Sequence, residues 1–407
     1  TSGDFYKVPM PIAFVVASAT ALLLNHKASL KSKIELFAHG MGNVDIMTMC
    51  LIFILAGAFA YTAKAMGAVD AAVNIALAFV PPNLLVCGLF IVACFISISI
   101  GTSVGTITLL VPIASAVSAA SGFELAFCVA SVMGGAMFGD NLSFISDTTI
   151  AACNGQGCEM KDKFRENFWI AFPAALVTLG LILVLSLRTD LGGAVNHEYH
   201  LIQMVPYILV LIGGIIGINV FLVLLIGIFS GIVIMLATGQ TSFVDLISSM
   251  GSGISGMFET CMVAVLVAAL CALIREYGGF EALLSVIRRI FRGRKGGQFG
   301  MGLLVAAMDI ATANNTVAIV MANPIAVEMS EEYGITHSKA ASLLDTYSCI
   351  SHGVIPYGAQ MLVALSAIHE MGHELSAFDV IPKLFYPGLL LVSSLIFIFI
   401  IPQKKVS

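Results

Sequence analysis

Long apolar runs fill most of the chain and are separated by short polar segments. The runs are continuous in Leu, Ile, Val, Ala and Phe rather than alternating between apolar and polar residues, as at 46–60, 168–187, 205–238 and 386–401. A helix needs about 20 apolar residues to cross the hydrocarbon core of a bilayer, whereas the strands of a membrane barrel alternate with a period of two. The pattern therefore predicts an all-α polytopic membrane protein and argues against a barrel.

Some of these runs are uninterrupted, and others contain a polar break. Uninterrupted crossings are expected at 8–25, 45–63, 168–187, 205–219, 221–238, 254–274 and 386–402. The stretches 84–121 and 299–330 each form two helices that meet at a polar break, and 124–152 and 336–367 are each interrupted midway. In each half, one interrupted element is expected to be a re-entrant hairpin and the other an unwound crossing helix. We favour 101–103 and 313–315 as hairpin tips, and the opposite assignment gives the same loop topology.

The two halves of the chain align with each other at an offset of 212 residues. In this register Pro112 falls on Pro324, Gly122 on Gly334, and the polar break at 101–103 on that at 313–315. Coinciding Pro, Gly and polar interruptions are harder to obtain by chance than matching apolar residues. The register predicts two repeats, 1–187 and 188–407, in a single membrane domain. The mate of crossing 205–219 would end near residue 7, so we expect the first repeat to lack its N-terminal helix.

Composition and charge agree with a membrane protein and orient the repeats. Hydrophobic residues make up 59% of the chain and charged residues only 11%, against about 25% in soluble proteins. Lys and Arg gather at 26–44, 159–166 and 275–295, whereas the repeat mates of these segments are nearly free of them. Because basic residues are enriched in cytoplasmic loops, equivalent loops are expected on opposite sides of the membrane, which is the property of an inverted repeat. We expect a multi-pass protein of the cell (inner) membrane with a cytoplasmic C-terminus.

Four aspartates lie within apolar sequence: Asp140, Asp147, Asp309 and Asp345. A carboxylate at membrane depth costs roughly 2.5–3.5 kcal/mol on insertion scales, so it is expected to face a cavity, a partner or an ion. Asp140 and Asp147 lie seven residues apart on the interrupted stretch 124–152, an expensive way to hold helices together by hydrogen bonds. Freed backbone carbonyls and hydroxyl groups there suit a dehydrated cation that needs about six oxygen ligands.

The candidate site contains residues from both halves. The first-half residues are Thr102, Ser103, Thr106, Asp140, Asn141, Ser143, Ser146, Asp147 and Thr148, with Na⁺ expected at Asp140, Ser143 and Asp147. The second-half residues are Asp309, Asn314, Asn315, Thr316, Asp345 and Tyr357. Single Ser and Thr side chains could equally serve only to join helices. His352, the mate of Asp140, is open to two interpretations, a proton relay or a hydrogen-bonded structural residue.

One metalloprotease-like pattern is set aside. His369-Glu370-Met371-Gly372-His373 satisfies H-E-x-x-H, which places two imidazoles on one face of a helix in zinc proteases. Gly372 weakens the helix that this geometry needs, and no obvious third ligand follows. We expect no enzymatic activity.

The polar breaks carry a family resemblance. The segments Gly101-Thr102-Ser103-Val104-Gly105-Thr106 and Gly139-Asp140-Asn141, with Ser143-Phe144-Ile145-Ser146-Asp147-Thr148-Thr149, resemble the GTSxGT and GDxxSxxSDTT patterns of the NhaC family of Na⁺/H⁺ antiporters, in the ion transporter superfamily. In the second half, 309–316 and 355–360 look like one branch of that family, and the similarity covers nearly the whole chain. Val104 and Phe144 depart from the family's usual Trp and Pro, and the family also includes amino-acid and organic-acid transporters, which leaves the substrate open.

The leading hypothesis is secondary antiport of Na⁺ against H⁺ by alternating access. A carboxyl group removed from water takes up a proton more readily, so a proton could displace the cation from the same oxygens. The rival is a Na⁺- or H⁺-coupled amino-acid or organic-acid transporter that uses Asn314, Asn315 and helix N-termini to hold an anionic group. The expected partners are Na⁺, H⁺, the lipid bilayer and, in the rival case, a small organic acid, with no nucleic acid and no cofactor besides the transported ions. A homodimer stays open.

Overall fold

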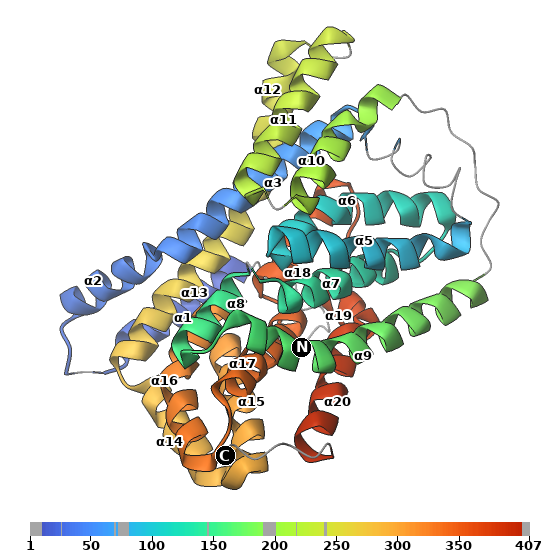
Figure 1. Ribbon diagram of the computed structural model, residues 1–407. Coiled ribbons are helices and arrows are strands. Elements are labelled where there is room, and N and C mark those ends of the chain that lie inside the picture. Colours follow the sequence, from blue (N-terminus) through green and yellow to red (C-terminus); the bar gives the residue numbers. More distant parts are fainter. Residues whose placement is uncertain are drawn as a thin grey trace.

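The computed structural model describes residues 10–25, 27–68, 71, 81–144, 146–189, 201–216, 218–239 and 242–400, and within them every regular element is a helix (Figure 1). The first-half helices are α1 (Met10–Leu23), α2 (Leu30–Met41), α3 (Val44–Ala65), η2 (Pro82–Leu84), α5 (Leu85–Ile100), α6 (Ser103–Ser121), α7 (Leu125–Leu142), α8 (Asp147–Gln156) and α9 (Met160–Arg188). The second-half helices are η3 (Leu201–Met204), α10 (Val205–Ile215), α11 (Val220–Ala237), α12 (Phe243–Gly256), α13 (Phe258–Glu276), α14 (Gly279–Ile290), α15 (Gly293–Thr312), α16 (Asn315–Tyr333), α17 (His337–Val354), α18 (Ala359–Glu370), α19 (Ala377–Val380), η4 (Ile381–Lys383) and α20 (Phe385–Phe399). The all-α architecture is confirmed.

Helix boundaries repeat at the offset found in the sequence. α16 and α17 begin and end 212 residues after α6 and α7, and α15 ends 212 residues after α5 (312 − 100). The caps repeat as well: Thr102 and Asn314 each accept a hydrogen bond from the backbone N–H three residues on, at the starts of α6 and α16. Gly101 and Ala313, with φ of 75° and 48°, are the mated left-handed residues between the helices of each pair. The predicted helix before residue 7 lies outside the described residues.

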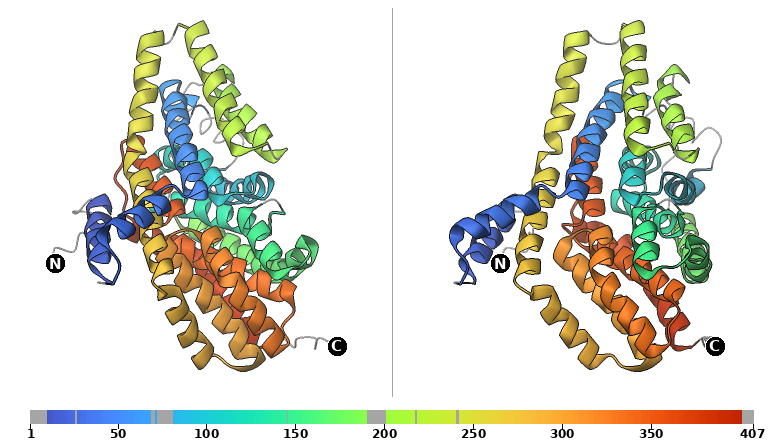
Figure 2. Two further views of the ribbon diagram at one scale, coloured as in Figure 1. Left: turned by 90° about the vertical axis from the view of Figure 1, so that its left-hand side faces the viewer. Right: turned by 60° about the vertical axis from the view of Figure 1, so that its left-hand side comes forward.

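Mated residues meet where the two halves cross. The Sγ of Cys349 lies 3.7 Å from the carbonyl oxygen of its mate Met137, so α7 and α17 cross near the axis that relates the halves. The mated helices α3 and α13 also meet: Cys50 and Cys261, 211 residues apart and so one residue short of the offset, exchange Sγ–carbonyl contacts of 3.8 and 3.7 Å. In Figures 1 and 2, α1 and α2 project on one side and their mates α11 and α12 on another. A pseudo-twofold axis therefore runs between the helices of both pairs.

The halves are interlocked rather than separate. α2 packs against α13 and its mate α12 against α3, while α6 packs against α18 and its mate α16 against α8. α5 and α6 also contact each other, as do α15 and α16, so each pair forms a helical hairpin whose tip lies at the predicted break. Each hairpin thus meets the short helix of the other half, which brings the polar breaks of both repeats to one place.

The predicted loops and crossings differ from the structure in several ways. The basic segments 26–44 and 275–295 contain helices α2 and α14, and 159–166 is mostly the first part of α9. Lys33 is buried on α2, where its ammonium donates to the Leu22 and Leu24 carbonyls at the end of α1. The sequence could not reveal this, because a lysine that is buried against the C-terminus of a neighbouring helix has the same sequence pattern as a lysine in a loop.

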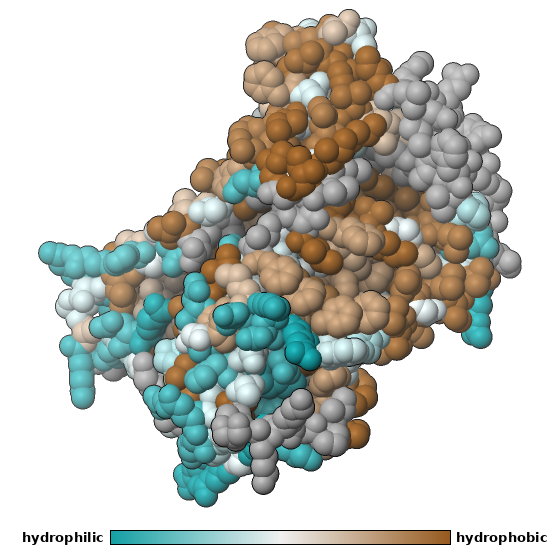
Figure 3. Space-filling view, viewed as in Figure 1, coloured by the Kyte–Doolittle hydropathy of each residue, from teal (hydrophilic) through white to brown (hydrophobic). Residues whose placement is uncertain are grey.

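Membrane spans can be assigned by length and composition. Among the described residues, Ile46–Ala63, Ser103–Ser121, Leu125–Gln156 and Met160–Arg188 could each cross a bilayer, and Ala377–Lys383 with Phe385–Phe399 could form a further span bent by 48°. α10, expected as a crossing over 205–219, has 11 residues, about 16 Å at 1.5 Å per residue, too short for a hydrocarbon core of about 30 Å. Apolar side chains cover much of the surface over α11, α5 and α9 in Figure 3, while polar ones gather near α2 and the lower end.

Candidate functional site

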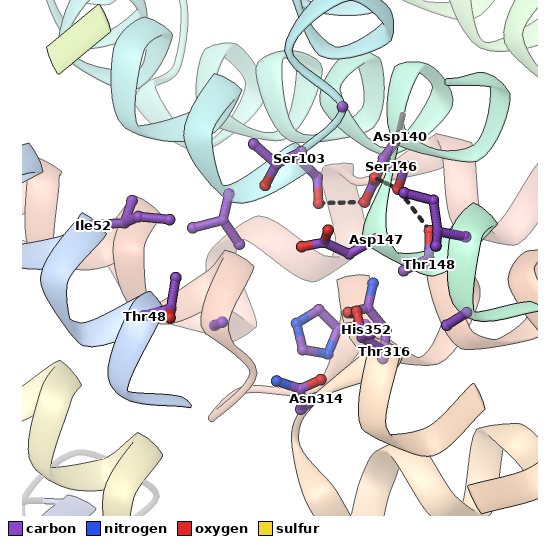
Figure 4. A pocket seen from close by; sticks show the side chains of 17 residues that line it. Thr48, Ile52, Ser103, Asp140, Ser146, Asp147, Thr148, Asn314, Thr316 and His352 are labelled. Carbon is purple, nitrogen blue, oxygen red and sulfur yellow. Dashed lines mark hydrogen bonds between the residues drawn. The ribbon is translucent and has the colours of Figure 1, made fainter. Parts of the chain in front are cut away.

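A cavity of about 470 Å³ lies where the hairpin tips meet the break between α7 and α8 (Figure 4). Its polar lining comes from both halves: Thr48, Thr102, Ser103, Asp140, Ser146, Asp147, Thr148, Asn314, Asn315, Thr316 and His352. Most of the predicted site residues are therefore brought together, although Asn314 and Asp140 are 174 residues apart in the chain (314 − 140).

Asp140 lies in the last turn of α7 and accepts two short hydrogen bonds. The Ser103 hydroxyl at the start of α6 donates to Oδ2 at 2.8 Å, and the Ser146 hydroxyl donates to Oδ1 at 2.5 Å. Ser146 occupies the N-cap position of α8, yet its side chain makes no cap hydrogen bond. Its hydroxyl is instead used on Asp140 and lies 2.8 Å from that of Thr148. At this break, the Ser146 hydroxyl therefore hydrogen-bonds to the Asp140 carboxylate instead of capping α8.

Asp147 begins α8 and is exposed, on the same cavity as the buried Asp140. Figure 4 shows its carboxylate between Asp140 and the ring of His352. Two carboxylates together with hydroxyl oxygens form a set of hard oxygen ligands, the kind that small alkali and alkaline-earth cations prefer. Hydroxyl groups can rotate, so Ser103 and Ser146 can present lone pairs to a cation in place of their protons.

Not every predicted residue lines this cavity. Thr106 donates to the Thr102 carbonyl at 3.0 Å, Ser143 donates to the Ile98 carbonyl at 2.8 Å, and Tyr357 donates to the Ile310 carbonyl at 2.7 Å. Asn141 does not line the cavity either, and its backbone carbonyl accepts hydrogen bonds from Lys163 and Asn167 of α9. The Asp140 carboxylate thus accepts hydrogen bonds from two of the predicted residues, Ser103 and Ser146, and Ser143 contacts the Ile98 carbonyl instead.

Asp309 and His352, both from the second repeat, pair with each other at the edge of the cavity. The His352 ring lines the cavity, and its Nδ1 lies 3.1 Å from Oδ1 of Asp309, which is fully buried on α15. The Ser351 hydroxyl donates to the other carboxylate oxygen at 2.7 Å. Asp309 therefore acts on the cavity through the imidazole and has no surface on it.

Asp345 has a different neighbourhood, which sequence reasoning missed. It forms a buried ion pair with Lys163 of α9, and Lys163 also donates to the Asn141 carbonyl at 2.9 Å and the Thr149 hydroxyl at 2.8 Å. Asn167, one helical turn later, donates to the same carbonyl at 2.6 Å. Lys163 thus contacts residues on both sides of the break between α7 and α8, namely Asn141 and Thr149. No sequence signal marked it, since the lysine stands in a charged segment that resembles a loop.

Gln360 of α18 is a second residue that the sequence did not single out. Its Nε2 donates to the Ser103 hydroxyl at 2.8 Å, and the side chain is fully buried. It therefore links the second-half short helix to the first-half hairpin tip, and so indirectly to Asp140. The sequence included it only as the last residue of the segment 355–360 that resembles the antiporter family, with no role assigned to it.

A second cavity, of about 420 Å³, lies on the other side of the second-half hairpin. It is lined by the α2–α3 turn, α13 and the hairpin tip, with His39, Arg275 and Glu276 among its polar groups. Asn314 lines both cavities. The H-E-x-x-H segment lies elsewhere: α18 ends at Glu370 and Gly372 has φ of 86°, so His369 and His373 do not share a helical face.

Comparison with known proteins places the chain in a family. Residues 9–187 and 193–401 match the model of the Na⁺/H⁺ antiporter family. The Na⁺/H⁺ antiporter NhaC of Bacillus subtilis (strain 168) is 24% identical over an alignment of 439 residues, which covers 98% of this chain and 92% of that protein. The malate-2H⁺/Na⁺-lactate antiporter of the same strain is 25% identical over 225 residues, 51% of this chain and 47% of that protein, so the match spans about half of that relative.

A solved structure supports the architecture. The YdaH transporter of Alcanivorax borkumensis, described as having an unusual topology, aligns with a TM-score of 0.52 at 13% identity and covers 96% of this chain and 98% of its own. At this identity the likeness shows the fold alone. The family model covers nearly the whole chain and confirms the resemblance found at the polar breaks. The protein accordingly belongs to the Na⁺/H⁺ antiporter family and is a multi-pass membrane transporter.

Proposed function

We propose that the protein exchanges Na⁺ for H⁺ across the cell membrane by alternating access, with Na⁺ held in the 470 Å³ cavity by Asp140 and Asp147. The observation that carries the proposal is the convergence of two carboxylates with the Ser103 and Ser146 hydroxyls at the meeting point of the two repeats. The cited relative NhaC, aligned over nearly the whole chain, is named as a Na⁺/H⁺ antiporter. Orientation with a cytoplasmic C-terminus belongs to the same proposal.

Coupling follows from the chemistry of the carboxylates. An ionised carboxylate attracts the cation, and a protonated one loses that attraction and becomes a hydrogen-bond donor. The same oxygens therefore hold either ligand, which makes Na⁺ binding release protons. A cavity that opened alternately to the two sides would convert this competition into exchange.

The arrangement of the two cavities supports the proposal of alternating access. Asn314 lines both the 470 Å³ cavity, hereafter the cation cavity, and the second cavity on the α13 side. The mates of Cys271 and Arg275, which line that second cavity, are Phe59 and Ala63, which are 0% and 1% exposed in the apolar core. The second-half side is therefore open where the equivalent first-half side is packed. Such an asymmetry is expected if this is one of two conformations that exchange the roles of the two halves about the pseudo-twofold axis.

Proteoliposomes with an internal pH dye test the proposal. An outward or inward Na⁺ gradient should move protons in the wild type, and Asp140→Asn and Asp147→Asn should each lower this flux by about tenfold or more, since removing one charged ligand of an ion typically costs more than about 1.4 kcal/mol. The matched control is Asp162→Asn on the exposed surface of α9, which should leave the flux unchanged. Wild-type exchange in both cavity variants would refute the assignment.

A second candidate, a Na⁺-coupled organic-acid transporter, is favoured by the size of the cavity. A volume of about 470 Å³ exceeds what a single ion needs and would admit a small carboxylic acid. Asn315 and Thr316 line it at the N-terminus of α16, where backbone N–H groups favour anions. The malate-2H⁺/Na⁺-lactate antiporter relative fits this possibility. Uptake of radiolabelled lactate and malate into the same proteoliposomes, with and without a Na⁺ gradient, separates the two candidates.

A further inference from the structure

The two halves place different titratable groups at equivalent positions of the cation cavity. Asp140 and His352 are repeat mates (352 − 140 = 212), and both line the cavity. The first half thus supplies a carboxylate and the second half an imidazole. If the halves were functionally equivalent, this difference in chemistry would serve no purpose, so the imidazole needs its own explanation.

The surroundings of His352 fix how its ring is oriented and which proton it keeps. A carboxylate accepts hydrogen bonds, so the Asp309 oxygen at 3.1 Å favours the tautomer in which Nδ1–H of His352 donates to it. The ring then has its Nε2 lone pair free to accept a further proton. Figure 4 shows the ring between Asp147 and Asn314, on the cavity side. Asp309 is fully buried, and the imidazole and the Ser351 hydroxyl are its partners.

A proton on Nε2 of His352 would place a positive charge beside the buried carboxylate of Asp309. A carboxylate shielded from water strongly prefers a positive partner, because unit charges interact more strongly at low dielectric. A proton accepted at Nε2 converts the ring to an imidazolium that pairs with Asp309 and adds one positive charge to the cavity wall. That charge repels a cation bound at Asp140 and Asp147, and loss of the proton removes the repulsion.

We propose that His352, positioned by Asp309, is a proton-binding site of the transport cycle that is separate from the cation-binding carboxylates, and that its proton and the cavity cation exclude each other. The inference rests on the proposed Na⁺/H⁺ exchange and adds a second route of coupling to it. Direct competition at one carboxylate allows one proton per site, whereas a separate imidazole supplies another that the cation displaces through charge alone.

The charged groups around His352 come from several helices. Asp309 of α15, Asp147 of α8 and Asp140 of α7 face it, and on its own helix Asp345 is neutralised by Lys163 of α9. From α16 and α18 the cavity-lining residues are Asn315, Thr316 and Ala359, none of which titrates. Tyr386 of α20 packs on Phe138. The carboxylates of Asp309, Asp147 and Asp140 are therefore the charged groups that an imidazolium at this position would face.

His352→Gln tests the inference, because glutamine keeps an N–H donor for Asp309 and cannot accept a transported proton. Two rates are measured in proteoliposomes: ²²Na⁺/Na⁺ self-exchange, which needs cation binding and alternating access but no proton, and Na⁺-driven proton flux. Coupling between two ligands is typically about 5- to 150-fold. We expect His352→Gln to retain self-exchange within about twofold and to move about half as many protons per Na⁺ as the wild type, because direct competition at the carboxylates remains.

Asp309→Asn is the second variant. It keeps the imidazole and removes its negatively charged partner, so we expect the Na⁺-driven proton flux to fall while ²²Na⁺ self-exchange is retained within about twofold. His337→Gln, on the same helix and away from the cavity, is the matched control and should behave as the wild type. Wild-type proton flux in His352→Gln would overturn the inference, as would equal loss of self-exchange and proton flux in both variants. Absence of Na⁺-driven proton flux in the wild type would instead refute the proposed function.

Discussion

Two buried aspartates of this protein differ in what balances their charge. Asp345 is paired with the ammonium of Lys163, whereas the carboxylate oxygens of Asp140 accept hydrogen bonds from the hydroxyls of Ser103 and Ser146. A fully paired carboxylate has no need of a cation, and one held by hydroxyls still attracts a positive ligand. The neighbours of each residue, and not its type or depth, therefore separate a structural aspartate from a candidate ligand.

Lys163 and Asp345 should stabilise the fold strongly. Removing one partner of a buried ion pair costs about 3–5 kcal/mol, because the other charge is left uncompensated. We expect Lys163→Met to lower the unfolding midpoint in detergent, and Lys163→Met with Asp345→Asn to recover part of the loss. Lys31→Met is the control, since the exposed Lys31–Glu35 pair at 3.9 Å contributes about 0–1 kcal/mol. A double variant as unstable as the sum of the two single variants would contradict the pairing.

At the scale of elements, α5 and α7 approach each other more closely than ordinary side chains allow. A Cβ added at Gly135 would stand 2.4 Å from the Phe90 carbonyl oxygen, and one at Gly139 would stand 2.6 Å from that of Cys94. The Ser97 hydroxyl donates across the same contact to the Ala136 carbonyl at 2.6 Å. This contact sets the position of α7 one residue before Asp140, and so positions the carboxylate against the hairpin tip.

Gly139→Ala should separate the two helices. The added methyl group meets backbone atoms that cannot turn aside, so we expect a loss of about 1–3 kcal/mol in unfolding free energy and weaker Na⁺ binding at Asp140. Gly180→Ala is the matched control: it lies on α9 with nothing within 4 Å of the added Cβ, and should be neutral or stabilising by up to about 1 kcal/mol. Thermal unfolding in detergent and ²²Na⁺ binding measure both effects. Unchanged Na⁺ binding in Gly139→Ala would show that the contact between α5 and α7 does not position the Na⁺ site.

At the scale of the whole molecule, the two halves are related by a pseudo-twofold axis but differ in the space they leave open: the second-half side has a cavity where the first-half side is packed. The Cys349 contact with Met137 marks the axis, and Cys271 lines the second cavity while its mate Phe59 is packed against Tyr207 at a ring-centroid distance of 5.4 Å. Exchange of the two arrangements would open the first-half side and close the second-half side.

Thiol labelling tests this exchange. In a variant that keeps Cys271 and replaces the other eight of the nine cysteines by Ser, a small membrane-impermeant thiol reagent should modify Cys271 from one side of the membrane only. Na⁺ should change the labelling rate, because a ligand shifts the populations of states that bind it differently. A variant that keeps only Cys349, buried at the axis, is the control and should stay unlabelled. Equal labelling of Cys271 from both sides, unaffected by Na⁺, would contradict alternating access at this cavity.

The sequence alone determined the helical membrane class, the repeat at an offset of 212 and the places where helices break. These features are local, since apolar run length, Gly and Pro act within a few residues of themselves, and a duplicated pattern is visible in one dimension. It also led to Asp140, Ser103 and Asn314, because polar groups in apolar runs are costly wherever they lie.

Only the tertiary structure decided which polar groups share a cavity and which neutralise one another. Lys163 meets Asp345 across 182 residues, and Gln360 meets Ser103 across 257. His352 becomes a candidate proton site through Asp309, on another helix. Such pairings depend on how the two repeats interlock about their axis, and the stability of a charge depends on what surrounds it in space. The sequence names each of these groups, and the fold determines which ones it brings into contact.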